Sequence, residues 1–412
     1  MSTFTCVLDG DKTPSANIKS KAVLSLHILL FTAGWDLSAI NISGFSVRLA
    51  WILLLAIPLL IPIAKHKKTA LAFIILFYLV HVFSSLLSDN PLQGLLYSFW
   101  IVFTYLFFLH FACSACNILQ AQTWNVILVN GRLQIFFAFL LYLTGIQERA
   151  NFIYYEPSYM AIALIPYVAT IFHLRNIKGI DVAALISYII SSQSGNFLVV
   201  LLLAGLLRFL MGGLNMRKLK LLFLIFLGGL LFTYYLLHDE SNINHATAKA
   251  ILTSGASIDS AIAIAERGGN RVPRMQVALE IFWENPFTGI GPTNYISHID
   301  GRNFSHITKD IPWIDPEGQP PTNAFIEAGV NAGILAVILL TVPFFYIIKK
   351  NRLRSHHSDD SKIVSAAGII IFIMMNLDSN YLRAYVWVFF GLAISSLSWR
   401  IKQNANCVNN NA

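Results

Sequence analysis

Two arginines at the start of a short amphipathic segment carry the clearest chemistry in this chain. Arg271 and Arg274 are three residues apart, so they share one face of the helix that the apolar spacing from Val277 to Phe282 predicts. The first N–H groups of a helix lack intrahelical acceptors, and the helix dipole disfavours cations there unless an anion is present. Two guanidinium groups at such an end are typical of a phosphate site. The alternative is that both arginines pair with nearby glutamates or face water.

These arginines lie in residues 238–322, a long polar stretch in an otherwise apolar chain. The stretch also holds Arg267, Arg302, His238, His245, His298 and His306. Short loops are enough to join membrane helices, so a loop of this length and charge indicates recognition or catalysis.

Glu156 immediately precedes Pro157 in the run Tyr155 to Tyr159, where an apolar segment begins. A carboxylate is stabilised at a helix N-terminus, which is sufficient reason for its presence. The functional alternative is that Glu156 borders a cavity, where it holds an arginine or accepts a proton from a sugar hydroxyl.

A second carboxylate, Glu327, falls about one turn inside the apolar segment that begins after Asn323. Such a position is costly in a membrane and suggests a lined cavity. Asn331 lies four residues later on the same face, and Gly329 and Gly333 form a GxxxG pattern typical of close helix packing. Polar residues before the last apolar segment, namely Asp378, Asn380 and Arg383, can reach the same cavity, or Asp378 and Arg383 can simply pair.

Between these candidates, residues 285–292 read Asn-Pro-Phe-Thr-Gly-Ile-Gly-Pro. Two prolines and two glycines in so short a run impose a fixed turn. We interpret this run as a structural corner that aims the loop after it.

The elements that position these residues are membrane helices. Hydrophobic residues make up 56% of the chain and charged residues 12%, too few to cover a soluble protein of this size. Apolar runs long enough to cross a bilayer must be helical, because a lone strand leaves its backbone unpaired in lipid. The sequence therefore predicts an all-α polytopic protein with about 12 spans. They fall near 20–41, 45–64, 70–88, 92–115, 122–146, 157–174, 179–192, 194–211, 218–237, 324–348, 362–377 and 381–400.

The basic residues predict the orientation. With an even number of spans, every cluster between Lys12 and Lys402 falls on the same side, which the positive-inside rule makes cytoplasmic together with both termini. We divide the chain into N-terminal spans (1–237), a large outer, periplasmic loop with helical segments (238–322), and C-terminal spans with a cytoplasmic tail (323–412). The net charge of +8 lies mostly in the cytoplasmic clusters, so it does not indicate a nucleic-acid partner.

Cofactor motifs are missing from the sequence. None of the four cysteines falls in the outer loops, and there is no zinc-type CxxC pair, P-loop or GxGxxG. We therefore expect neither a metal nor a nucleotide cofactor.

The order of these motifs resembles the O-antigen polymerase/ligase superfamily of bacterial glycosyltransferases. The resemblance covers roughly residues 150–400 and rests on Glu-Pro-Ser at 156–158, the arginine-bearing loop, the 285–292 run and the segment 322–333. It implies an inner-membrane enzyme of lipopolysaccharide or related polysaccharide biosynthesis that acts on an undecaprenyl-pyrophosphate-linked oligosaccharide, with its lipid among the helices. A chain-length-regulator membrane protein is a further implied partner.

The resemblance also implies roles for individual residues. Arg271, with Arg267 and Arg274 beside it, grips the pyrophosphate in a metal-independent transfer. Glu156, Glu327, His298 and His306 are candidate bases, and Tyr159, Asn323 and Arg383 are candidate glycan or pyrophosphate contacts.

Two departures from the family pattern matter. The run 191–196 lacks the arginine that often begins the eighth span, and Thr322 stands where ligases usually have histidine before Asn323. The second departure favours a polymerase that joins repeat units. A ligase that transfers glycan to lipid A-core and a lipid-linked oligosaccharide flippase are the alternatives. A flippase would more often show internal repeats and charges deep in its spans.

Overall fold

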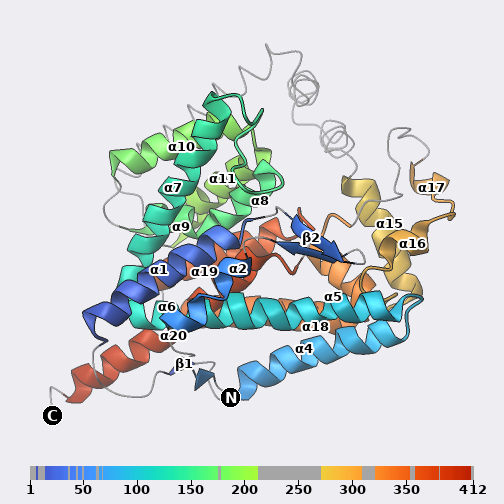
Figure 1. Cartoon of the computed structure of the whole chain (residues 1–412), viewed down its shortest axis with the longest axis horizontal. Coiled ribbons are helices and arrows are strands. Elements are labelled where there is room, and N and C mark those ends of the chain that lie inside the picture. The colour runs from blue at the N-terminus through green and yellow to red at the C-terminus, as the bar shows by residue number, and fades with distance from the viewer. Residues whose placement is uncertain are drawn as a thin grey trace.

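The computed structural model describes residues 6–7, 14–35, 38–42, 45–48, 51–61, 65–66, 68–174, 178–211, 271–308, 321–352, 358–379 and 381–409. This part of the chain is predominantly helical, as predicted (Figure 1). Arg267, Asn380 and the predicted span 218–237 lie outside the described residues.

The helices before residue 212 are α1 (Ala16–Thr32), α2 (Trp51–Leu54), α3 (Ile57–Leu60), α4 (Lys68–Leu86), α5 (Pro91–Phe103), η1 (Thr104–His110, a π-helix), α6 (Phe111–Leu119), η2 (Gln120–Gln122), α7 (Thr123–Leu143), α8 (Pro157–Ala163), α9 (Ile165–His173), α10 (Gly179–Ser192) and α11 (Gly195–Leu210). Those after residue 270 are α15 (Arg271–Glu284), α16 (Tyr295–Ile299), α17 (Ser305–Thr308), α18 (Ala324–Arg352), α19 (Asp359–Met374) and α20 (Ala384–Asn409). The strands are β1 (Cys6–Val7), β2 (Ser38–Ile42), β3 (Phe45–Arg48) and β4 (Lys65–His66), which pair antiparallel as β1 with β4 and β2 with β3.

Two groups of helices pack around the C-terminal ones. In one group, α4 lies against α5 and α18, while η1 and α6 pack on α20. In the other, α9 and α11 pack on α19, and α7 packs on α9 and α10 (Figure 1). One core of buried apolar side chains runs through both groups. A second, smaller core joins α15 and α16 to α18.

The predicted span 45–64 is not one helix. Its residues form β3 and then the short helices α2 and α3, and the preceding β2 contributes the other half of a hairpin. Apolar residues alternate along Ile40, Ile42, Phe45 and Val47, a strand pattern, and Pro58 falls in the first turn of the separate helix α3.

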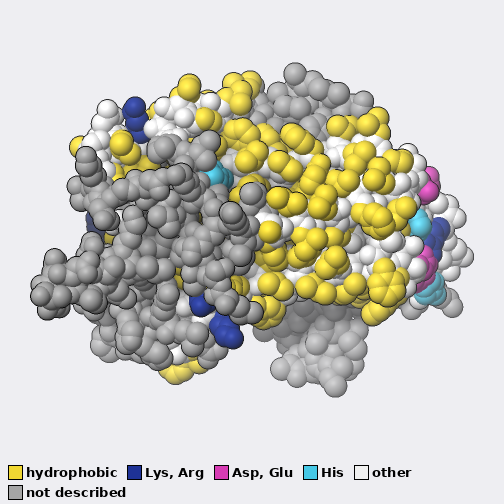
Figure 2. Space-filling model, turned by 90° about the horizontal axis from the view of Figure 1, so that it is seen from below, with side chains coloured by type: hydrophobic (Ala, Val, Ile, Leu, Met, Phe, Trp, Pro, Cys, Tyr) yellow, Lys and Arg dark blue, Asp and Glu magenta, His cyan; other side chains and the backbone are white. Residues whose placement is uncertain are grey.

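The described helices present a broad apolar surface. Figure 2 shows hydrophobic side chains spread over one face, with acidic, basic and histidine side chains together at its right edge and further basic side chains elsewhere on the face. Within the described residues, the stretches Pro91–Leu143 and Ala324–Asn351 are long and apolar enough to cross a membrane. Four shorter apolar helices accompany them: Ala72–Leu86, Gly179–Ser192, Gly195–Leu210 and Ala384–Leu397. The count of about 12 spans therefore stays a prediction.

Helix α18 is interrupted at Ala332 and Gly333, where the backbone leaves helical geometry. The turn formed by residues 285–292 closes this break with backbone hydrogen bonds. The N–H of Ile290 donates to the Val330 carbonyl at 2.8 Å, and the N–H of Ile334 donates to the Pro286 carbonyl at 2.7 Å. The 285–292 run is thus a structural corner, as interpreted from the sequence, and it is anchored on α18.

Glycine is required on both sides of this junction. Gly289 has φ +66 and Gly333 has φ +75. A Cβ atom on Gly289 would meet the Val330 carbonyl, and one on Gly333 would overlap the Phe287 carbonyl. Our interpretation of Gly329 and Gly333 as a helix-packing GxxxG is therefore wrong for Gly333, which belongs to the break. Gly329 does pack between helices, because it lies close to the ring of Phe282 on α15.

Replacing Gly333 by alanine should destabilise the protein, because the new Cβ meets backbone and the positive φ costs about 1–3 kcal/mol by itself. We expect a clear fall in the unfolding temperature of the detergent-purified chain. Gly195→Ala is the matched control, because nothing lies within 4 Å of its added Cβ. Equal unfolding temperatures for the two variants would contradict the role of the break.

Candidate functional site

The candidate site is a cluster of polar side chains at the end of the bundle where α4 ends and α5, α8, α18 and α20 begin. Its most defined contact joins Arg383 and Tyr159. The Arg383 guanidinium carbon lies 3.9 Å from the centre of the Tyr159 ring, a cation–π arrangement. Tyr159 is buried and also interacts with Asp378, Ser379 and, through charge, Glu156. The start of α8 and the connection from α19 to α20 are thereby held together.

Glu327 lies in the same cluster. It projects from the first turn of α18, is only 9% exposed, and interacts through charge with Tyr97 of α5 and Tyr381. Tyr97 lies within Coulombic range of both Glu327 and Arg383. The structure therefore brings together three of the residues predicted from sequence, namely Tyr159, Glu327 and Arg383.

Tyr381 joins this cluster to the helices around it. Its hydroxyl lies 2.7 Å from Nε2 of His81 on α4 and 3.3 Å from the side-chain nitrogen of Asn331. Its carbonyl accepts a hydrogen bond from the indole N–H of Trp387 at 3.1 Å. Both His81 and Tyr381 are fully buried.

Glu156 lies at the exposed rim of the site. It is the N-cap residue of α8, where its carboxylate accepts a hydrogen bond from the Ser158 hydroxyl at 3.0 Å. It also interacts through charge with Arg149. Arg149 donates to the carbonyls of Ser192 at 3.0 Å and Gln193 at 2.9 Å, so a guanidinium reaches the corner between α10 and α11. The run 191–196 lacks an arginine of its own, and Arg149 provides one there.

Asn323 caps helix α18 and links it to the end of α19. Its side-chain oxygen accepts the N–H groups of Phe325 and Ile326 at 2.9 and 3.1 Å, which caps the start of α18. Its side-chain nitrogen donates to Asn376 at the end of α19. Thr322 precedes it and is buried.

The loop helices bear the remaining predicted residues. Arg271 is the first residue of α15, and Arg274 follows one turn later within Coulombic range of Tyr295. Burial raises the pKa of Tyr295, and the positive charge of Arg274 opposes that rise. His306 of α17 pairs with Glu280 at 2.8 Å on an exposed surface.

A second pair fastens the same loop. Arg302 donates to Glu284 at 2.8 Å, and this hydrogen bond lowers the pKa of the Glu284 carboxyl. His298 lies 3.8 Å from the same carboxylate. The two histidines considered as bases are therefore engaged with glutamates of α15.

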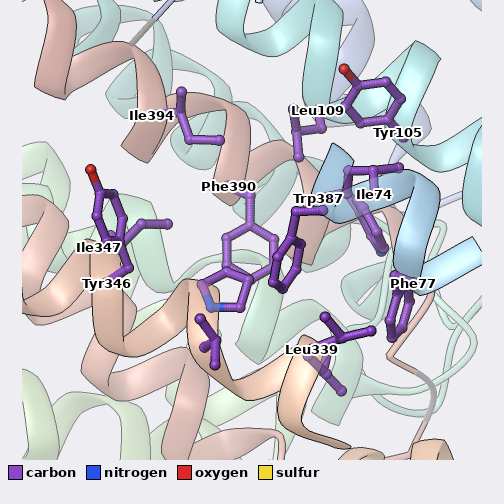
Figure 3. A pocket seen from close by; sticks show the side chains of 14 residues that line it. Ile74, Phe77, Tyr105, Leu109, Leu339, Tyr346, Ile347, Trp387, Phe390 and Ile394 are labelled. Atoms are coloured by element: carbon purple, nitrogen blue, oxygen red, sulfur yellow. The ribbon is translucent and has the colours of Figure 1, made fainter. Parts of the chain in front are cut away.

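An apolar pocket of about 120 Å³ lies deeper along the same helices (Figure 3). It is lined from α4, η1, α18 and α20, with Phe77, Leu339 and Trp387 among its residues. The Phe77 ring lies 6.0 Å from that of Tyr381 and 4.5 Å from that of His81. Phe77, in the wall of the pocket, therefore packs against the His81 and Tyr381 rings of the polar cluster.

Sequence reasoning missed His81, Tyr97, Tyr381 and Arg149. The first three are single polar residues within or beside apolar segments, and nothing in their spacing links them. A polar side chain in an apolar span is costly, so each of these residues is expected to have a polar partner. The sequence does not show which residue that partner is. In the described part of the chain, no three or more His, Cys, Asp or Glu side chains are placed to hold a metal ion.

An O-antigen ligase family model matches residues 180–341, a range that includes the 285–292 turn and the start of α18. The match supports the O-antigen polymerase/ligase superfamily. It does not separate a polymerase from a ligase. No curated protein matches the chain. Members of the superfamily are glycosyltransferase-like enzymes with lipid-linked glycan substrates, and the long apolar helices together with this match indicate a membrane protein.

Removing the Tyr159 ring should loosen this end of the bundle. Tyr159→Leu deletes the face on which Arg383 lies, and we expect a loss of about 0.5–2 kcal/mol from the cation–π contact, plus lost packing. Tyr159→Phe keeps the face and should retain most of the stability. Unfolding of the purified chain measures both, with the exposed neighbour Tyr155→Leu as control. If Tyr159→Leu and Tyr155→Leu have the same stability, the contact between Arg383 and Tyr159 does not stabilise this end of the bundle.

Proposed function

We propose that the chain is a polysaccharide polymerase that joins oligosaccharide repeat units carried on undecaprenyl pyrophosphate at the periplasmic face of the inner membrane. The observation that carries this proposal is that the polar cluster adjoins the apolar pocket, because the Phe77 ring in the pocket wall lies 6.0 Å from the ring of Tyr381. Two helices contribute to both parts of the site. Helix α18 bears Glu327 and the pocket residue Leu339, while Tyr381 lies just before α20, which bears the pocket residue Trp387.

This arrangement suits an amphipathic substrate with a charged head and a long hydrocarbon tail. The head lies among the polar groups at the helix ends, and the tail extends inward along apolar side chains. The pocket accommodates only a short part of a polyprenyl chain, and the exposed apolar side chains of α4 and α5 provide a surface for the rest.

Arginines around the cluster supply the charge that a pyrophosphate requires. Arg383 lies in the cluster, Arg149 at its rim, and Arg271 and Arg274 on the helix packed against α18. A guanidinium pairs with phosphate oxygens through two parallel hydrogen bonds, which also fixes their orientation. We assign Arg271 and Arg274 to the donor pyrophosphate and Arg383 to the glycan or pyrophosphate near Glu327.

The transfer then proceeds in one displacement. An acceptor hydroxyl gives its proton to a carboxylate, Glu327 or Glu156, and its oxygen forms a bond to the anomeric carbon of the donor. The bond from that carbon to the pyrophosphate breaks, and the electron pair leaves with the pyrophosphate. The arginines stabilise the charge that develops on this leaving group.

The residue before Asn323 favours polymerase over ligase. Threonine does not exchange a proton near neutral pH, whereas the histidine usual in ligases does. Thr322 is buried at the start of α18, beside the cap residue. A ligase that works without this imidazole, and a flippase, remain the two alternatives that experiment must separate.

The acceptor requirement decides between these activities. Purified protein given only lipid-linked repeat units should lengthen them into a ladder, detected by gel electrophoresis of the released glycan. Thr322→Ala should keep substantial activity, because the hydroxyl does not take up the proton. A product formed only after lipid A-core is added would establish a ligase, and transbilayer movement of unit-length substrate without extension would establish a flippase.

Filling the apolar pocket should weaken donor binding. Leu339 is 6% exposed and lines the pocket, so Leu339→Trp should occupy the space proposed for the lipid. Each methylene of the lipid that the indole excludes loses about 0.8 kcal/mol of burial, which corresponds to a roughly fourfold rise in KM for a polyprenyl donor. The neighbouring Ile338→Trp is the control, because Ile338 is 48% exposed on the same helix. Unchanged KM in Leu339→Trp would place the lipid elsewhere.

A further inference from the structure

We infer that His81 is a positioning residue, which fixes the direction of a hydrogen-bond chain through Tyr381 and Tyr97 so that neither tyrosine donates its proton to Glu327. The inference rests on the proposed function, because it assigns Glu327 as the base of the transfer. It concerns residues on α4, on α5 and in the connection before α20, which sequence reasoning did not link.

The direction of the chain follows from His81. Its Nδ1 lies 2.8 Å from the carbonyl oxygen of Phe77, one turn back on α4, and a carbonyl can only accept. Nδ1 therefore carries the ring proton. Both groups that face the ring nitrogens are neutral, and a fully buried imidazolium would need a charged partner. Nε2 is then an acceptor, and its partner at 2.7 Å, the Tyr381 hydroxyl, must donate to it.

Tyr381 can donate only one proton, and it is committed to His81. The hydroxyl oxygen therefore acts as acceptor toward its other partners. Asn331 donates to it from its side-chain nitrogen at 3.3 Å, and Tyr97, which is also hydrogen-bonded to it, donates as well. Every proton in this chain points from Tyr97 toward His81 and the Phe77 carbonyl.

The proton of each tyrosine is thereby committed to a partner other than Glu327. Glu327 interacts with Tyr97 and Tyr381 through charge. A tyrosine hydroxyl that turned toward the carboxylate would stabilise its ionised form and make it a weaker base. By accepting from Tyr381, His81 prevents that turn, so the carboxylate is not weakened as a base by a tyrosine proton.

Other charged and titratable groups around Glu327 are retained in the test. They are Arg383 before α20, Asp378 after α19, Tyr159 on α8 and Tyr97 on α5. Changing only His81 leaves each of them in place, so an altered pH profile reports the hydrogen-bond direction.

The deciding experiment compares two replacements of His81 in the purified full-length chain supplied with lipid-linked repeat units. His81→Gln retains an acceptor near the position of Nε2, whereas His81→Leu has none. We expect His81→Leu to lower kcat by about tenfold, which is less than the ~10²–10⁴ that the base itself contributes. The acid limb of its pH–rate profile should move to lower pH, with KM changed little, and His81→Gln should recover most of kcat and the original profile.

Two comparisons complete the design. His173, equally buried on α9, provides the control His173→Leu, which should keep the pH profile. Tyr381→Phe should lower kcat, and adding it to His81→Leu should cost little more, because the two residues act as one unit. The inference fails if His81→Leu and His81→Gln share one profile, or if ¹⁵N spectra of His81 place the proton on Nε2. If the unaltered chain does not extend repeat units at all, the proposed function fails first, while the ¹⁵N result still tests the hydrogen-bond direction.

Discussion

The junction between the 285–292 turn and the interruption of α18 is the constraint on which the rest of the site depends. A backbone break inside a membrane helix leaves carbonyl and N–H groups without partners, at a cost of several kcal/mol each in hydrocarbon. Here the freed groups pair with the turn, through Ile290, Gly291 and Pro286, and the Asn331 carbonyl also accepts the Ser84 hydroxyl at 2.7 Å. The loop helices and α18 consequently form one unit, and α15 cannot move away from the site without breaking these bonds.

The interruption also divides α18 into two functional halves. Glu327 and Asn331 lie before it, among polar partners, while Leu339 lies beyond it in the wall of the apolar pocket. A continuous helix would keep the backbone carbonyl of Asn331 within its own ladder. Because the break frees that carbonyl for Ser84 and Gly291, this residue can bind the loop and α4 with its backbone while its side chain holds Tyr381. Polar recognition and apolar packing can therefore adjoin each other on one helix.

Much of this arrangement could be predicted from the sequence. There are physical reasons why the rest of it could not be. Apolar runs identify helices because bilayer thickness sets their length, and proline and glycine mark the turn because they restrict or permit particular φ values. Tyr159, Glu327 and Arg383 could be proposed as neighbours, because each falls at the start of an apolar segment on the same predicted side. The contact between His81 and Tyr381 spans 300 residues, and no periodicity encodes it. The break at Gly333 was equally hidden, because a GxxxG pattern reads the same whether the second glycine packs a helix or interrupts one.

Burial and hydrogen bonding reduce the number of side chains that could accept the proton in the transfer. Both ring nitrogens of His81 are occupied, His306 is held at the surface by Glu280, and Nε2 of His298 lies beside Arg302 and Glu284. None of these imidazoles is therefore placed to receive a proton from a sugar hydroxyl beside Arg383. That leaves the two carboxylates. Glu156 is exposed at the start of α8, where its carboxylate already accepts the Ser158 hydroxyl and water screens its interaction with a bound substrate. Glu327 is buried among tyrosines whose protons point elsewhere, and an electrostatic interaction there is stronger than in water. The hydrogen-bond chain that begins at His81 thus makes Glu327 the stronger candidate for the base, with Glu156 better suited to hold Arg149 at the rim.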